Sequence, residues 1–165
     1  MNPTEAITLV DYNAWATGHI LDAAARLEPE QFTAILGSNT SSLQSILVHA
    51  LSAERLWRVR LQSGISPSMP NTGDIPDVDS LRQLWHEEAA AFREYLMTLD
   101  DGALEETVQF RRLSGELSDP IARWVVVTQL VTHGTQHRSE AATLLTSYGQ
   151  SPGDLDFLFF ILRLR

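Results

Sequence analysis

The stretch LVTHGTQHRSEAATLL, residues 130–145, places His133 and His137 four positions apart within a run that has the residue spacing of a helix. Residues i and i+4 of a helix lie on one face, with about 6 Å between their Cβ atoms. The residues that share this face are Val126, Leu130, Ala141, Leu144 and Tyr148. We therefore expect both imidazoles to face the core from one long helix, which begins at Asp119-Pro120 and ends at Tyr148 with Gly149 as its C-cap.

Three more segments have the apolar spacing of helices. In the first, Asn2 supplies an N-cap and Pro3 occupies the first helical position. The spacing of its apolar residues continues to Leu27. Pro29 and the stretch LGSNTSS, residues 36–42, then predict a break that separates the first helix from the second.

The second and third helices are each predicted from a capping-box pattern, in which a serine N-cap is followed three residues later by a glutamine. Ser41 with Gln44 begins the second helix, which ends at Gly64. Ser80 with Gln83 begins the third helix. The stretch GISPSMPNTGDIPD between them is rich in proline and glycine, so it predicts a long crossover loop.

The segment before the last long helix is predicted to be a small hairpin. TVQFRRLSGELS, residues 107–118, is too short and too polar for a helix, and Ser114-Gly115 is suited to a turn. The sequence contains no internal repeat and no low-complexity segment. Four long amphipathic helices with a long connection between the second and third predict an all-α four-helix bundle, in a single domain over residues 1–165.

The composition excludes several partners and chemistries. Twelve basic and 21 acidic residues give a formal net charge of −9, which disfavours nucleic acid and membrane surfaces as partners. The chain has no cysteine, so any thiol chemistry must use a thiol that the substrate brings. The start MNPTEAITLVDYNAW lacks the pattern of a signal peptide, and no run approaches the ~20 apolar residues of a membrane helix. We expect a cytoplasmic protein.

A third histidine is predicted to join the pair on the last helix. His49 shares a stripe of the second helix with Ile46, Ala53 and Leu56, on an inward or boundary face. Bundles build their sites from side chains on facing helices, so three imidazoles can converge. A buried imidazole without a partner costs about 1 to 3 kcal/mol, and one divalent metal ion would satisfy all three. In the competing interpretation, carboxylates or backbone carbonyls satisfy them by hydrogen bonding.

The other histidines and the motif inventory favour a single mononuclear site. His86 shares the polar side of the third helix with Arg82 and Arg93, and His19 lies at the edge of the first helix, within possible reach of the same cavity. The sequence has no HExxH motif, no pair of Glu-x-x-His motifs, no G-x-S-x-G elbow, no P-loop and no GxGxxG. Haem is disfavoured, because an i, i+4 pair suits one small ion better than ligands on opposite ring faces.

Three stretches together resemble a known family. DYNAWATGHIL near the start, LQSILVHALSAERLW in the second helix and LVTHGTQHRSEAATLLTSYGQSPGDLDF near the end are similar to the DinB/YfiT-like family of metalloenzymes, in order and spacing over nearly the whole chain. The resemblance implies an up-down-down-up four-helix bundle, frequently dimeric, with a divalent metal ion on His49, His133 and His137. Some relatives use such a metal to activate bacillithiol, mycothiol or glutathione for transfer or isomerisation.

One departure from the family pattern follows His137. Relatives often have Arg-Gly-Gln there, whereas this chain has Arg138-Ser139-Glu140. Glu140 lies one turn beyond His137, where it is placed to orient that ligand, to act as a catalytic base or to bind the metal itself. In the alternative interpretation its carboxylate pairs with an arginine such as Arg138 or Arg165.

The sequence leads us to expect a metal-dependent transferase. Zinc, nickel, manganese or iron would activate a small-molecule thiol toward an electrophilic substrate. Tyr12 and Trp15 on the first helix are candidates to line the pocket, although aromatic residues at helical spacing are usually core. The alternatives are a non-catalytic bundle with a structural metal and a metal-free dimeric interaction module. The apolar tail FLFFILRLR, residues 157–165, predicts a homodimer.

Overall fold

The computed structural model describes residues 1–35 and 41–164 and is mainly helical, as the sequence predicts. The long helices in these residues are α1 (Pro3–Ala24), α3 (Leu43–Ser63), α4 (Val78–Met97) and α5 (Arg123–Ser147). The shorter elements are α2 (Pro29–Thr33), the 3-10 helix η1 (Thr72–Asp74), the strands β1 (Thr107–Val108) and β2 (Ile121–Ala122), and α6 (Phe157–Arg163). Within the described residues, no helix has both the length and the hydropathy needed to cross a membrane.

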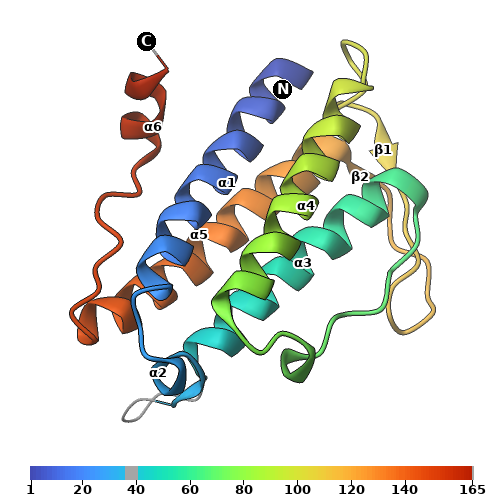
Figure 1. Cartoon of the computed structure of the whole chain (residues 1–165). Coiled ribbons are helices and arrows are strands. Elements are labelled where there is room, and N and C mark those ends of the chain that lie inside the picture. Colours follow the sequence, from blue (N-terminus) through green and yellow to red (C-terminus); the bar gives the residue numbers. More distant parts are fainter. Residues whose placement is uncertain (36–40, 165) are drawn as a thin grey trace.

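The long helices pack against one another as a ring of neighbours. α1 contacts α4 and α5, and α3 contacts the same two helices. Figure 1 shows the four helices side by side, with α6 at the edge beside α1 and an extended connection from the end of α3 back to the start of α4. Two apolar clusters fill the interior, one that includes Leu47 and Trp85 and one that includes Phe92 and Leu130. Each long helix therefore buries one face in these clusters and meets neighbouring helices along seams at its sides.

The first helix starts where the sequence predicts but ends earlier. The Asn2 side chain accepts a hydrogen bond from the Glu5 N–H, and the Glu5 carboxylate accepts one from the Asn2 N–H, which completes a capping box. α1 ends at Ala24 instead of continuing to Leu27. The N–H groups of Arg26 and Leu27 bond only three residues back, to the carbonyls of Ala23 and Ala24, as in the tightened last turn of a helix. Pro29 then holds the residue before it in an extended conformation and begins the separate short helix α2.

The N-caps of α3 and α4 differ from the predicted ones. α3 begins after Ser42 instead of Ser41, and the Ser42 hydroxyl accepts a hydrogen bond from the Ser45 N–H at 3.1 Å. α4 begins after Asp77, whose carboxylate accepts a hydrogen bond from the Ser80 N–H at 2.8 Å. Ser80 is therefore a donor to the cap and not the cap itself. An aspartate caps as well as a serine does, and its negative charge is favourable at a helix N-terminus.

The connections on either side of α3 agree with the prediction where the structure describes them. Gly64 ends α3 in the left-handed conformation, with a φ of +68°, and the long crossover to α4 follows it. A Cβ atom at this position would also lie 3.0 Å from the backbone oxygen of Gln109. Of the predicted break between the first two long helices, residues 36–40 lie outside the described residues.

The segment before α5 forms the predicted small hairpin. β1 and β2 pair in an antiparallel arrangement, and the turn between them contains Gly115 at a φ of +91°. The hairpin uses residues up to Ala122, so α5 begins at Arg123 and the predicted start at Asp119-Pro120 is wrong. Residues that pair in a strand are extended and cannot also form the first turn of a helix.

The C-terminus of α5 has the hydrogen bonding of a Schellman motif. The Gln150 N–H donates to the Leu145 carbonyl at 2.8 Å, and Gly149 has a φ of +75°. Gly149 therefore ends the helix as predicted, although α5 itself ends at Ser147 and not at Tyr148.

The tail folds as α6 and is only partly covered. Phe160 is buried against α1, where its ring centroid lies 5.9 Å from that of Tyr12. Ile161 is partly buried against the same cluster, whereas four other large apolar side chains of α6 are exposed, namely Phe157, Leu158, Phe159 and Leu162. α6 therefore has an apolar outer face that the described residues leave uncovered.

Candidate metal centre

Three histidines from two helices meet at the seam between α3 and α5. His49 comes from α3, and His133 and His137 lie one turn apart on α5. One ring nitrogen of each histidine lies within 4.8 Å of those of the other two. The ring centroids are 5.3 Å apart for His49 and His133, 4.8 Å for His49 and His137, and 4.4 Å for His133 and His137. The structure thus brings together the three histidines that the sequence grouped.

The cluster lies at the edge of the bundle, which corrects the prediction that the imidazoles face the core. His49 is exposed, and His133 and His137 are partly exposed. The buried face of α5 instead includes Gly134 and Arg138. Neither a glycine nor an arginine counts as apolar in a periodicity pattern, so the predicted face is rotated toward the histidines.

His137 has a polar partner on each ring nitrogen. Its Nδ1 atom lies 2.8 Å from Oε2 of Glu140, and its Nε2 atom lies 3.2 Å from Nε2 of His133. A carboxylate accepts hydrogen bonds, so it favours a proton on Nδ1 and leaves the Nε2 lone pair facing His133. Two nitrogens on one tetrahedral zinc ion are about 3.3 Å apart, and a direct imidazole–imidazole hydrogen bond has a similar length. The spacing therefore fits a shared ion and also fits the metal-free interpretation.

The electrostatic environment favours the neutral imidazoles of His49 and His133. Burial lowers the pKa of His49 and of His133, the neighbouring His137 lowers both further, and Glu140 acts in the opposite direction. For Glu140, burial raises the pKa, but hydrogen bonds with His137 and Gln136 outweigh this and the net pKa is lowered. Neutral imidazoles beside an ionised carboxylate are the protonation states that bind a cation.

A buried polar layer crosses the bundle beside the cluster, with one residue from each long helix. Its members are Asn13 of α1, Glu54 of α3, Trp85 of α4 and Arg138 of α5. Asn13 donates to the Glu54 carboxylate and accepts from the Arg138 guanidinium, and the Trp85 indole N–H donates to Glu54 at 3.1 Å. Arg138 also donates to the Thr135 hydroxyl at 2.9 Å. These bonds satisfy charges that would otherwise be costly to bury.

The polar layer is both shielded from solvent and closely packed. Burial raises the pKa of Glu54 to about 7, even though hydrogen bonds from Asn13 and Trp85 and the charge of Arg138 lower it. A Cβ atom at Gly134 would lie 2.5 Å from Oδ1 of Asn13, so the contact between α1 and α5 requires a glycine there.

Sequence reasoning missed the polar layer, although one signal was present. Asn13 falls on the same helical spacing as the buried residues Val10, Ala16 and Ile20 of α1. A polar residue at a core position indicates a buried hydrogen-bonding partner elsewhere in the chain. That partner, Glu54, comes from another helix, and spacing along one helix cannot identify it.

Tyr12 and Trp15, the candidate pocket residues, lie against the tail. The Tyr12 hydroxyl donates to the Leu155 carbonyl at 2.9 Å. The Trp15 ring centroid lies 5.6 Å from that of Phe160 and 4.8 Å from that of His19. Among the described residues, the ring neighbours of Tyr12 and Trp15 include none of the three clustered histidines.

The remaining histidine and the arginines considered as partners of Glu140 lie elsewhere. His86 is exposed on α4, as the sequence predicts. Arg138 belongs to the polar layer and points away from Glu140, which is hydrogen-bonded to His137 and Gln136. Arg165 lies outside the described residues.

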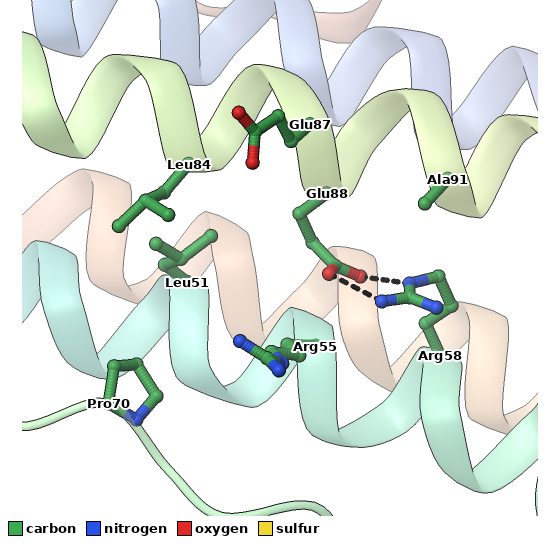
Figure 2. Close-up of a pocket in the computed structure, with 8 residues that line it drawn as sticks. All are labelled: Leu51, Arg55, Arg58, Pro70, Leu84, Glu87, Glu88 and Ala91. Atoms are coloured by element: carbon green, nitrogen blue, oxygen red, sulfur yellow. Dashed lines mark hydrogen bonds and ion pairs between the residues drawn. The ribbon is translucent and has the colours of Figure 1, made fainter.

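A hollow of about 330 Å³ between α3 and α4 is separate from the histidine cluster. Figure 2 shows Glu88 reaching from α4 toward α3, where it makes two hydrogen bonds with Arg58. Leu51 and Leu84 lie at the other end of the same view. No histidine is among the residues that line this hollow in the described part of the chain.

The fold and the cluster define a class: helical proteins with a potential metal centre built from histidines of two facing helices. Within this class the comparison is specific, because the model of the DinB family matches residues 1–163. The chain therefore belongs to the DinB family, which confirms the resemblance seen in its motifs. No curated protein matches the chain significantly.

Proposed function

We propose that this DinB-family protein binds one divalent metal ion through His49, His133 and His137, and that it uses the ion to transfer a low-molecular-weight thiol to an electrophilic substrate. The observation that carries the proposal is the set of three ring nitrogens within 4.8 Å of one another. Imidazole is a suitable ligand for zinc, nickel and iron, and the donor set also admits manganese. Three histidine ligands with open positions are typical of catalytic metal sites.

The exposure of the cluster supports a catalytic site over a structural one. A structural zinc site is closed by four protein ligands. In the part of the chain that the structure describes, the group of candidate ligands contains three histidines, and the Glu140 carboxylate contacts Nδ1 of His137. His49 is exposed, so an ion held by the three histidines would be reachable from solvent by a thiol.

Each residue of the centre has a distinct role in the proposed reaction. A divalent ion, when bound, supplies the positive charge that lowers the pKa of a thiol toward neutrality. The three histidines would hold that charge without neutralising it, because imidazole binds a metal ion in its neutral form. Glu140 fixes the proton of His137 on Nδ1 and so orients Nε2, which makes it a positioning residue in this proposal. Arg138, the next residue after His137, anchors α5 in the polar layer.

The assembly proposed for the protein follows from the packing and the surface. The contacts of α1 and of α3 with both α4 and α5 support an up-down-down-up four-helix bundle in one domain. The exposed apolar side chains of α6 support a homodimer, because a patch of this kind is usually covered by a partner. The substrates proposed are a small-molecule thiol and an electrophile of the cytoplasm, and the net charge of −9 disfavours nucleic acid and membranes as partners.

Metal analysis and a thiol panel test the proposal. Protein purified without a histidine tag is expected to hold about one divalent ion per chain. Glutathione, bacillithiol and mycothiol are then assayed with epoxide, maleyl and halide electrophiles, using metal-loaded wild type, apo protein, His49→Ala and the surface control His86→Ala. We expect at least one thiol to react faster with wild type and His86→Ala than with apo protein or His49→Ala.

Two results would contradict the proposal in different ways. Metal-loaded wild type that never exceeds His49→Ala would leave the metal as a structural link between α3 and α5. Negligible binding of zinc, nickel, manganese and iron at neutral pH would favour the interpretation in which hydrogen bonds satisfy the histidines.

A further inference from the structure

A hollow of about 240 Å³ lies between α1 and α4, the helix pair that carries none of the three clustered histidines. Leu21 and Trp85, each 3% exposed, are among its most buried lining residues. Ala14 and Gly18, which precede Leu21 on α1, and Ala89, which follows Trp85 on α4, also line it. Small residues on facing helices beside a large indole therefore leave a space bounded mainly by apolar atoms. We call this space the α1–α4 hollow.

Gly18 keeps the α1–α4 hollow open, although neither packing nor backbone geometry requires a glycine there. A Cβ atom at Gly18 would meet no heavy atom within 4 Å, and the residue does not have a positive φ. Glycine in a helix interior is less stable than alanine. Gly134 is the opposite case, because a Cβ atom there would collide with Asn13. What the glycine at position 18 provides is the space itself.

The side chain of Thr17 adds a polar group to the same hollow. Thr17 lines the hollow and is 1% exposed, and its hydroxyl oxygen has no hydrogen-bond partner among the described residues. A buried hydroxyl without a partner destabilises the folded protein, and valine of nearly the same shape would avoid this. Rotation of the Thr17 side chain about χ1 would turn the covered hydroxyl toward the hollow, where a polar atom of a ligand would supply the missing partner.

Two side chains with N–H donors border the hollow on successive turns of α4. Arg82 donates through one terminal nitrogen to Asp22 at 2.8 Å, and the described residues occupy none of its other N–H groups. His86 follows one turn later and is exposed. An arginine edge beside an imidazole suits a carboxylate, which accepts paired hydrogen bonds.

We propose that the α1–α4 hollow binds a small aromatic carboxylate, with its ring against Trp85 and its carboxylate at Arg82 and His86. A cavity of about 150 Å³ is enough for benzene, so 240 Å³ admits a ring with its acid group or two fused rings. The site is independent of the proposed metal centre, which lies on the other pair of helices.

The direct test is calorimetric titration with 2-naphthoate, with 2-naphthamide as the uncharged counterpart. EDTA-washed protein is used, so that a metal ion cannot bind the carboxylate, and a metal-loaded sample is run beside it. We expect saturable 1:1 binding of the acid in both samples and binding of the amide at least about tenfold weaker. Absence of saturable binding of the acid at millimolar concentration would overturn the proposal, and so would equal binding of acid and amide.

Two substitutions test the hollow itself, and each predicts opposite effects on stability and binding. Gly18→Leu places an apolar side chain in the space from a position where a Cβ atom meets no heavy atom within 4 Å, so it should raise Tm and weaken 2-naphthoate binding at least about tenfold. Thr17→Val removes the unpartnered hydroxyl, so it should also raise Tm while weakening binding. Wild-type affinity in Gly18→Leu would overturn the proposal, and a rise in Tm confirms that the variant is folded.

The carboxylate contact has a matched control on the same two helices. Arg82 and Arg93 both extend from α4 to an aspartate of α1, and Arg93 pairs with Asp11 at 3.2 Å, away from the hollow. Arg82→Gln should lose most of the preference for the acid over the amide, whereas Arg93→Gln should keep it. Equal losses in both variants would show a general effect of charge and would contradict the proposed contact.

Discussion

The histidine cluster and the polar layer are two ways in which the same helices arrange polar groups. The cluster lies at the seam between α3 and α5, open to solvent, with ring nitrogens that face one another. The polar layer lies inside the bundle, and its carboxylate, amide, indole and guanidinium groups satisfy one another. The cluster leaves imidazole lone pairs available for an ion. In the polar layer, the carboxylate, amide, indole and guanidinium groups are already hydrogen-bonded to one another.

The two regions meet at successive residues of α5. His137 belongs to the cluster and Arg138 to the polar layer, and successive residues of a helix point about 100° apart. Fixing Arg138 inside the bundle therefore fixes the rotation of α5 that presents His137 to His49. The comparison predicts that changes in the layer act on stability, and that changes in the cluster act on metal binding.

The largest effect is expected from Arg138→Met. At pH 8 the substitution removes the cation beside Glu54, so the buried carboxyl must either stay charged without a partner or take up a proton, and the free energy of unfolding should fall by about 3 to 5 kcal/mol. Urea denaturation measures this difference. The matched control is Arg93→Met, which removes an exposed ion pair and should cost less than about 1 kcal/mol. Similar losses in both variants would remove the distinction between layer and surface.

A slightly smaller effect is expected from the titration of Glu54. Its pKa is raised by burial to about 7 in the folded protein from 4.5, so the folded state holds the proton more tightly than the unfolded state does. Stability from this group is complete below pH 4.5 and is lost as pH rises toward 7, by about 3 kcal/mol.

The measurement compares wild type with Glu54→Gln in urea at several pH values. The stability of Glu54→Gln relative to wild type should increase between pH 4.5 and 7 and be constant below that range. Parallel stability curves over the whole range would mean that Glu54 does not titrate in the folded protein near pH 7.

The third prediction concerns the cluster, where we expect a large effect on metal binding and a small effect on stability. His133→Ala should weaken zinc binding at least about 100-fold, which corresponds to about 2.7 kcal/mol, because one of three ligands is lost. The unfolding free energy of the apo protein should change by less than about 1 kcal/mol, because this imidazole is partly exposed. His86→Ala should leave zinc affinity unchanged in competition titrations. A large loss of apo stability in His133→Ala would place this histidine in the core after all.

The smallest effect is expected from Glu140→Gln. The amide oxygen can still accept a hydrogen bond from Nδ1 of His137, so only the negative charge is lost, and zinc affinity should fall about tenfold. Glu94→Gln, an exposed carboxylate of α4, is the control with the same charge change and should have no effect. A loss as large as that of His133→Ala would make Glu140 a metal ligand and not a positioning residue.

The sequence predicts those parts of the molecule that depend on neighbouring residues. Asn2 caps α1 and Gly64 and Gly149 end their helices, because a cap or a left-handed residue is decided by a few adjacent positions. The start of α4 is predicted wrongly because a choice between two nearby caps also depends on a few adjacent positions. Asp77 and Ser80 are both good caps, and only the hydrogen bond from the Ser80 N–H to Asp77 distinguishes them.

The candidate site is predictable in its members but not in its depth. Spacing along one helix groups His133 with His137, and the expected packing of facing helices in a bundle adds His49. The exposure of the cluster depends on which face α5 buries, and that face is set by Arg138 and Gly134 through contacts with Asn13. Asn13 comes from the opposite end of the chain, so these contacts have no signature in the local pattern.

The hydrogen bond between Asn13 and Arg138 spans 125 positions of the chain, and this separation has a consequence for folding. The loop that it closes cannot form until almost the whole polypeptide is available, and long-range contacts of this kind slow folding. During synthesis, Asn13 and Glu54 leave the ribosome well before Arg138 does. The first three long helices can therefore collapse onto one another only with the Glu54 carboxyl lacking its cationic neighbour. Among the four long helices, α5 is therefore the last that can join the others as the chain is synthesised.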